Sequence, residues 1–149
     1  MSSIRDIDAA QVDQKDGKIM LGDWKGRESF HISEVDTILQ RLQTQRAKVG
    51  RPVPDDMKKA MHYCKRFKPL RNESSAGKAK EQVLRRVEIN GSLQPRCHDF
   101  EASQLLNLMP STAEEAKTLI PTLENNPYLE ALVKEIQPMR DFDRGIGYH

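Results

Sequence analysis

The sequence has few of the residues that stiffen or cross-link a small protein. Aromatic residues make up 5% of its 149 positions, so we expect a core built on Leu, Ile, Val, Met and Ala. Its two cysteines, Cys64 and Cys97, are too few for a disulfide framework, which fits a reducing intracellular compartment. A small aliphatic core in a chain with 31% charged residues favours a protein that a partner completes.

Long hydrophobic runs are also missing. The longest one near the N-terminus is Ile19-Met20-Leu21, which is too short for the apolar region of a signal peptide, and no run is long enough to span a membrane. We therefore expect a soluble intracellular protein with no membrane partner. The length suits one domain with an arm or tail outside it.

Patterns typical of catalysis or metal binding are absent. The pairs His62/Cys64 and Cys97/His98 lack the separation of two to four residues that is usual between structural zinc ligands. No glycine-rich stretch leads into a helix with a Lys-Ser/Thr pair, as a phosphate-binding loop would. No serine lies in a nucleophile motif. The sequence therefore predicts no enzymatic activity, no catalytic residue, no metal site and no cofactor.

Positive charge is concentrated in the middle of the chain. Residues 58–96 carry 11 basic and three acidic side chains, whereas residues 97–149 carry four and nine. This segment forms either a basic surface for RNA, DNA or an acidic protein, or the solvated faces of two helices. Tyr63 and Phe67 have the helical spacing of core residues, so we expect no aromatic stacking platform. The candidate nucleic-acid contacts are Lys65, Arg66, Lys68, Arg71, Arg85 and Arg86.

Residues 1–32 lack helical periodicity, because glycines interrupt their short apolar pieces. We expect an extended arm, which can add to the edge of a partner's sheet. Trp24 and Phe30 either fold back onto the first helix or dock onto another protein. The arm residues assigned to partner binding are Ile4, Ile7, Val12, Ile19, Leu21 and Trp24.

From residue 33 onward the apolar residues recur at helical spacing. We expect a first helix that Ser33 opens, a second over residues 55–68 that buries Phe67, and a third from about residue 75 to about residue 89. Residues 90–95 should form a loop. A last helix should begin at Asn126 and end at Pro138. The expected organisation is an arm at 1–32, a helical domain at 33–142 and a flexible tail at 143–149.

Residues 100–124 predict two short helices separated by a proline stop. Pro110 disfavours the helical region for the residue before it, so the first helix should end there. Ser111 and Glu114 have the spacing of a capping box at the start of the second helix. Pro121 should end that helix.

The run from Leu105 to Glu124, LLNLMPSTAEEAKTLIPTLE, resembles the signature of the fourth subunit of eukaryotic RNA polymerase II. His98, Phe100 and Glu101 resemble the H-x-F-E that introduces this signature in the family. Residues 8–12, DAAQV, resemble its N-terminal D-A-x-Q-L, and residues 136–142 resemble its C-terminal end. The loop expected at 90–95 departs from the family pattern, in which the preceding helix runs more directly into the signature helix.

The resemblance implies an all-α fold of about five to six helices, similar to the C-terminal domain of helicases and ribonuclease D, with an extended N-terminal arm. Members of that family pair with the seventh polymerase subunit, an OB-fold protein, and form a stalk on the polymerase core beside the RNA exit channel. They act in the nucleus in transcription initiation, and they contact RNA mainly through that partner. On this basis Phe100, Leu105 and Leu108 join the expected partner-binding residues.

The sequence leaves two other classes of function open. One is the paralogous stalk subunit of RNA polymerase III or of the plant polymerases IV and V. The other is a free-standing helical module that binds nucleic acid without a partner. The proteins that purify with the chain distinguish the first class, and nucleic-acid affinity without a partner distinguishes the second.

Overall fold

A computed structural model describes residues 26–143 of the chain. In order, its elements are α1 (Ile32–Lys48), α2 (Asp55–Phe67), α3 (Glu73–Val83), β1 (Arg86–Ile89), β2 (Ser92–Pro95), α4 (Asp99–Leu108), α5 (Ala113–Leu119), the 3-10 helix η3 (Pro121–Leu123) and α6 (Leu129–Asp143). The described part is therefore mostly helical, as the sequence predicts. The expected arm residues 1–25 and the last six residues of the tail lie outside the described residues.

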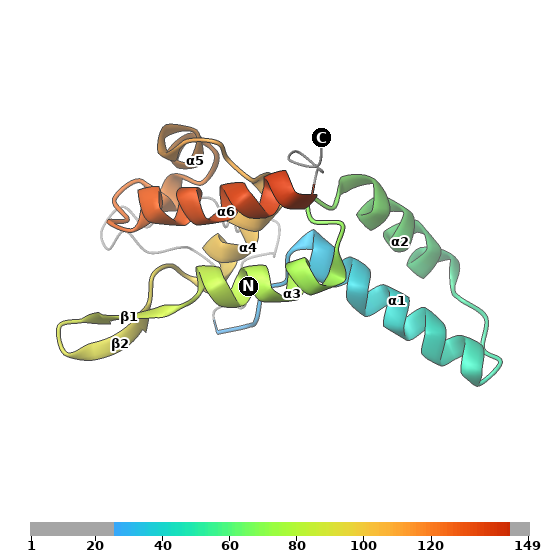
Figure 1. Ribbon diagram of the computed structural model, residues 1–149. Helices are drawn as coiled ribbons and strands as arrows, with labels where there is room; N and C mark the ends of the chain where they lie inside the picture. Colours follow the sequence, from blue (N-terminus) through green and yellow to red (C-terminus); the bar gives the residue numbers. More distant parts are fainter. Residues whose placement is uncertain (1–25, 144–149) are drawn as a thin grey trace, which may run out of the picture.

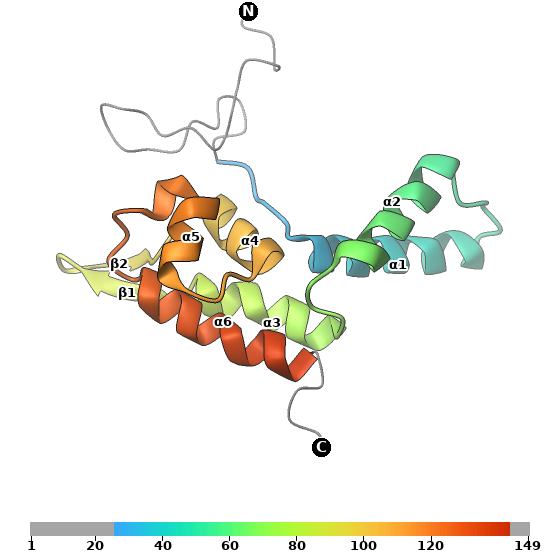
Figure 2. The ribbon, with the colours of Figure 1, turned by 90° about the horizontal axis from the view of Figure 1, so that it is seen from above.

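Helices α3 to α6 form the body of the molecule, from which two hairpins project (Figure 1). The α1–α2 hairpin extends from one end of the body, and the β1–β2 hairpin extends from the other. Helix α3 packs against α1, α4 and α6, and α5 packs against α6. The view from above shows α3 and α6 side by side along one edge of the body, with α4 and α5 behind them (Figure 2).

The core lies between the helices of the body and is aliphatic, as the composition predicts. Helix α6 buries an apolar stripe at helical spacing, namely Leu129, Leu132, Val133 and Ile136. Leu105 and Leu106 of α4 meet this stripe within the same cluster. The remaining members of the cluster are Leu70, Ala76, Ala79, Val83, Cys97, Ala102, Met109, Ala116, Ile120 and Leu123.

The third helix is shorter than the sequence analysis predicts. It ends at Val83, and residues 86–95, expected as a helix end followed by a loop, form an antiparallel hairpin in which Ile89 pairs with Ser92. Asn90 and Gly91 form the two-residue turn with φ of 52° and 80°, as a type I′ turn requires. The Asn-Gly pair, preceded by the β-branched residues Val87 and Ile89, was the sequence signal for this hairpin.

Buried Arg96 holds the base of the β hairpin against the body. Its guanidinium donates two hydrogen bonds of 2.7 Å to the Glu135 carboxylate on α6 and one of 2.8 Å to the Gln82 carbonyl on α3. The hydrogen bond from Arg96 is the main cause that lowers the pKa of Glu135, so this carboxylate is held in its charged form. The basic charge of Arg96 is therefore structural.

Two predicted helix starts are shifted along the chain. Helix α1 begins at Ile32 with His31 in the N-cap position, one residue before the expected Ser33. Helix α5 is capped by Thr112 rather than Ser111, because the Thr112 hydroxyl accepts a 3.1 Å hydrogen bond from the Glu115 amide. The Glu115 carboxylate in turn accepts one of 2.9 Å from the Ser111 amide. The cap is thus built as expected, but one residue later.

Pro110 ends a helix, whereas Pro138 does not. Helix α4 ends at Leu108 as predicted, and Met109 before Pro110 takes a left-handed conformation with φ of 45°. Pro138, predicted to end the last helix, instead lies inside α6, which continues to Asp143. Because Pro138 is exposed, the carbonyl that loses its helical partner can bind water. The helix also begins at Leu129, after the expected Asn126.

Candidate functional site

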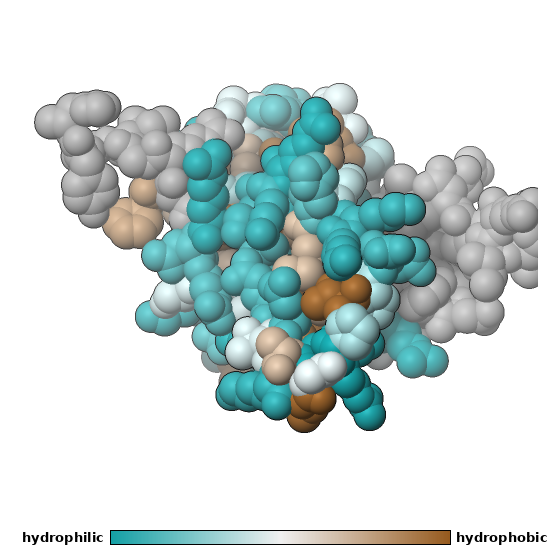
Figure 3. All heavy atoms as spheres, turned by 90° about the vertical axis from the view of Figure 1, so that its right-hand side faces the viewer, coloured by the Kyte–Doolittle hydropathy of each residue, from teal (hydrophilic) through white to brown (hydrophobic). Residues whose placement is uncertain are grey.

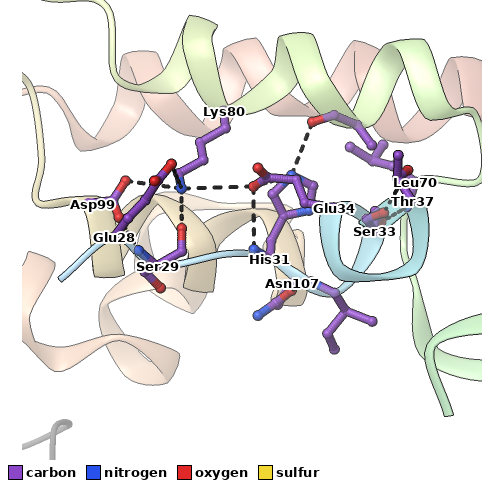
Figure 4. Close-up of polar contacts among 12 residues, drawn as sticks. Glu28, Ser29, His31, Ser33, Glu34, Thr37, Leu70, Lys80, Asp99 and Asn107 are labelled. Atoms are coloured by element: carbon purple, nitrogen blue, oxygen red, sulfur yellow. Dashed lines mark hydrogen bonds and ion pairs between the residues drawn. The ribbon is translucent and has the colours of Figure 1, made fainter. Parts of the chain in front are cut away.

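Residues 28–32, which we call the strap, lie between α3 and α4 and end at the first residue of α1 (Figure 4). On the α4 side, the Ser29 amide donates to the Asp99 carboxylate and the Ile32 amide donates a 2.8 Å hydrogen bond to the Asn107 side chain. On the α3 side, the Ser29 carbonyl accepts a hydrogen bond from Lys80. The strap is therefore fixed by hydrogen bonds of its own backbone to both helices.

Lys80 is the central charge of this site. Its side chain is only 8% exposed, and its ammonium group lies 3.2 Å from Asp99 and 3.9 Å from both Glu28 and Glu34. It also lies 5.0 Å from the centre of the Phe30 ring, within reach of a cation–π interaction. A buried ammonium is tolerated only where several acceptors surround it, and most of these acceptors come from the strap and its flanks. Burying Lys80 therefore depends on the strap being in place.

His31, within the strap, is fully buried, with 0% of its surface exposed. Its Nε2 lies 3.1 Å from the Ala76 carbonyl, so the proton resides on Nε2, which donates to that carbonyl. Burial lowers the pKa of His31 to about 4; the hydrogen bond to Ala76 opposes this shift and the charge of Lys80 adds to it. The imidazole is therefore neutral at pH 7 and serves as a packed, hydrogen-bonded group.

These groups form an anchor and not a catalytic centre. The carboxylates are bound to Lys80, and burial raises the pKa of Glu34. Both cysteines are buried, and burial raises the pKa of the Cys97 thiol to about 12, far from the range of a reactive thiolate. Within residues 26–143 no group of three or more His, Cys, Asp or Glu side chains is placed to hold a metal ion. Over the same residues no helix is long and apolar enough to cross a membrane.

Three of the predicted partner-binding residues lie on α4. Leu105 is fully buried in the core, so its apolar surface is already used within the chain. Phe100 is partly buried, whereas Leu108 is 44% exposed and lies next to Asn107, which holds the strap. Leu108 and Phe100 therefore remain candidates for a contact with another protein. The other predicted residues, Ile4, Ile7, Val12, Ile19, Leu21 and Trp24, lie outside the described residues.

The structure divides the predicted nucleic-acid contacts between the two ends of the molecule. Lys65 and Arg66 are exposed on α2, whereas Arg85 and Arg86 are exposed at the β hairpin on the opposite side of the body (Figure 1). Lys68 forms a 2.6 Å ion pair with buried Asp36. The sixth predicted residue, Arg71, is exposed in the connection between α2 and α3. The six residues therefore do not form one continuous basic face.

The burial of Lys80 and the exposure of Tyr63 and Phe67 were not expected from the sequence. Lys80 lies one helical turn from Ala76 and Val83, so its position on the inward stripe of α3 was the available signal for its burial. Tyr63 and Phe67 were expected in the core but are 54% and 49% exposed. Helix α2 packs mainly against α1 and buries only Met61 and Cys64. Its aromatic residues therefore have no second layer to enter.

Residues 30–140 match the family model described as RNA polymerase Rpb4, a span that runs from the strap into α6. The chain is 30% identical over 126 residues to the DNA-directed RNA polymerase II subunit rpb4 of Schizosaccharomyces pombe, covering 80% of this chain and 86% of that protein.

Two further relatives match over shorter spans. The DNA-directed RNA polymerase II subunit RPB4 of Saccharomyces cerevisiae is 37% identical over 84 residues, which is 54% of this chain and 34% of that protein. The rpb4 subunit of Dictyostelium discoideum is 30% identical over 87 residues, which is 57% of this chain and 50% of that protein. The match thus spans about a third to a half of the length of these two relatives. By the extent of the family match and the fission yeast relative, the chain belongs to the RNA polymerase Rpb4 family.

Proposed function

We propose that this chain is a non-catalytic stalk subunit of RNA polymerase II. The observation that carries the proposal is the family match, which includes α1 to α5 and most of α6. The relatives with that match are named as subunits of RNA polymerase II. The buried anchor at Lys80 supports a structural role for the described residues, because its charged groups bind one another.

Within this proposal the chain pairs with the OB-fold seventh subunit, acts in the nucleus, and contacts RNA mainly through that subunit. The strap revises the predicted extent of the partner-binding arm. Residues 28–32 bind the chain's own α3 and α4, so the segment that reaches the partner comprises residues 1–27. Phe30 and Leu108 stay about half exposed at the strap and at the end of α4, where they extend this contact surface.

Affinity purification of the tagged full-length chain tests the assignment to RNA polymerase II. Mass spectrometry of the purified material should identify the large subunits of RNA polymerase II together with the seventh subunit. Recovery of the large subunits of RNA polymerase III, or of no polymerase, would contradict the proposal.

A deletion series tests the extent of the arm. Removing residues 1–27 should abolish or strongly reduce the heterodimer on size-exclusion chromatography, while the helical content measured by circular dichroism stays constant because the strap is retained. An undiminished heterodimer would show that the arm is not the main contact. The matched control is removal of residues 144–149, which we expect to leave the heterodimer intact.

A further inference from the structure

The outer side of α2 presents aromatic rings among positive charges. Tyr63 and Phe67 are one turn apart and both about half exposed, with ring centres 4.7 Å apart and planes inclined by 42°. The guanidinium of Arg66 lies 5.3 Å from the centre of the Phe67 ring. Lys59 is exposed one turn before Tyr63. We call Lys59, Tyr63, Arg66 and Phe67, which share one side of the helix, the α2 face.

The charge of the α1–α2 hairpin is strongly one-sided. Residues 41–68 contain nine Lys and Arg residues but only two acidic residues, Asp55 and Asp56. Among the described residues the Lys58 ammonium lies 3.8 Å from Asp55, whereas no carboxylate forms an ion pair with Lys59 or Arg66. The cations nearest the aromatic rings are therefore available to an anionic ligand.

This hairpin is also open to solvent. Helix α2 packs mainly against α1, and the hairpin extends away from the body (Figure 1). The end of the molecule that carries it is mostly hydrophilic, with small separate hydrophobic patches (Figure 3). A ligand bound to the α2 face would thus contact charged and aromatic side chains without meeting the helices of the body.

We propose that the α2 face is a direct binding site for single-stranded RNA. Exposed aromatic rings that stack on bases, combined with cations that contact phosphates, are the two elements of single-strand recognition. Tyr63 and Phe67 supply the stacking surface, and Lys59 and Arg66 supply the phosphate contacts. The choice of RNA over DNA rests on the proposed function, since RNA is the single-stranded product of a transcribing polymerase.

The rings favour RNA over an acidic segment of another protein. An acidic peptide would use the same cations, but its contact would depend on exposed aliphatic surface, whereas the large apolar groups exposed on α2 are both aromatic. Unpaired bases expose flat π-faces that a duplex keeps stacked inside. The site should therefore prefer a single strand to a duplex.

Fluorescence anisotropy with a labelled oligouridine and with a matched RNA duplex tests the proposal. The full-length chain is used without the seventh subunit, so that RNA bound by that subunit does not mask the α2 face, and each variant is compared with the wild type in the same state. Loss of stacking in the double variant Tyr63→Ala/Phe67→Ala should weaken oligouridine binding at least about tenfold. Two phosphate contacts predict a slope of about −1.4 for the logarithm of affinity against the logarithm of salt concentration.

Matched variants separate stacking from folding and from general charge. Phe67→Trp should keep the affinity, because indole stacks at least as well, and Phe142→Ala on α6 should leave it unchanged. Arg66→Glu should weaken binding, whereas Lys134→Glu on α6 should not. Circular dichroism of each variant checks that the helices are retained, and co-purification with the polymerase tests the proposed function separately from RNA binding.

Three results would overturn the inference. One is an unchanged affinity of the Tyr63→Ala/Phe67→Ala variant for oligouridine. Another is equal or tighter binding of the duplex. The third is displacement of the RNA by polyglutamate at equal charge, with polyglutamate binding lost in the same double variant, which would assign the α2 face to an acidic protein.

Discussion

Replacing Lys80 by methionine should release the strap from the body. Methionine retains most of the side-chain volume but removes the ammonium group that contacts Asp99 at 3.2 Å and donates to the Ser29 carbonyl. Breaking a buried ion pair by removing one partner costs about 3–5 kcal/mol, because the remaining charges lose their compensation. Asp99 and Glu34 are partly exposed, with 26% and 18% of their side-chain surfaces accessible, so water can compensate them in part. We therefore expect a loss near the lower limit, about 3 kcal/mol.

This loss is large against the total stability of roughly 5–15 kcal/mol that is usual for a single domain. Urea denaturation followed by circular dichroism measures the free energy of unfolding of the variant and of the wild type. Hydrogen exchange of the Ser29 and Ile32 amides, which donate to Asp99 and Asn107, reports on the strap itself. Both amides should exchange faster in Lys80→Met.

The matched control is Lys78→Met, since Lys78 is exposed on the same helix. A double-mutant cycle with Asp99→Asn measures the coupling between Lys80 and Asp99, which should exceed about 1 kcal/mol for a buried pair. If Lys80→Met changed the free energy of unfolding by less than about 0.5 kcal/mol and left both strap amides protected, the assignment of Lys80 as the anchor would be wrong.

Three further predictions follow from the described geometry. The lowered pKa of His31 stabilises the fold above the unfolded-state pKa of about 6.5, and this contribution of about 3 kcal/mol should be lost as the pH falls to about 4. The raised pKa of Glu34 changes the stability in the opposite direction over this pH range. The free energies of unfolding of the wild type and of His31→Gln are therefore compared by urea denaturation over the same range, and their difference gives the contribution of His31. Thr112→Ala should lower the free energy of unfolding by about 1 kcal/mol through loss of the α5 cap, and Thr112→Ser should retain the wild-type value. Gly91→Ala should destabilise the β hairpin by about 1 kcal/mol because of the positive φ, whereas Gly77→Ala in α3 should not; equal effects in thermal melts would contradict the turn assignment.

Some helix ends depend only on groups that are close together along the chain. His98 caps α4 by accepting a 3.1 Å hydrogen bond from the Phe100 amide, and Glu101 accepts one of 2.9 Å from the His98 amide. In this chain the run from His98 to Glu101 therefore serves as a capping box at the start of α4. The stop at Pro110 also depends only on neighbouring backbone atoms.

Predictions failed where two local signals competed. The apolar spacing of residues 83–89 favoured a longer third helix, but the Asn-Gly turn and the β-branched residues before it produce a hairpin. Pro138 was expected to stop the last helix, yet burial of residues on both sides of it, Ile136 and Met139, keeps the chain helical to Asp143. Packing of a helix face outweighed the loss of one backbone hydrogen bond.

By itself, the sequence determined the family, the aliphatic core and the order of most helices. These depend on residue type, helical period and backbone capping over a few positions. Only the tertiary structure decided that Lys80 is buried while Tyr63 and Phe67 are exposed. An inward position becomes buried only if a second element covers it; the strap covers Lys80, and nothing among the described residues packs over the outer side of α2. Whether a helix face finds such a cover depends on elements distant in the chain, which helical spacing does not encode.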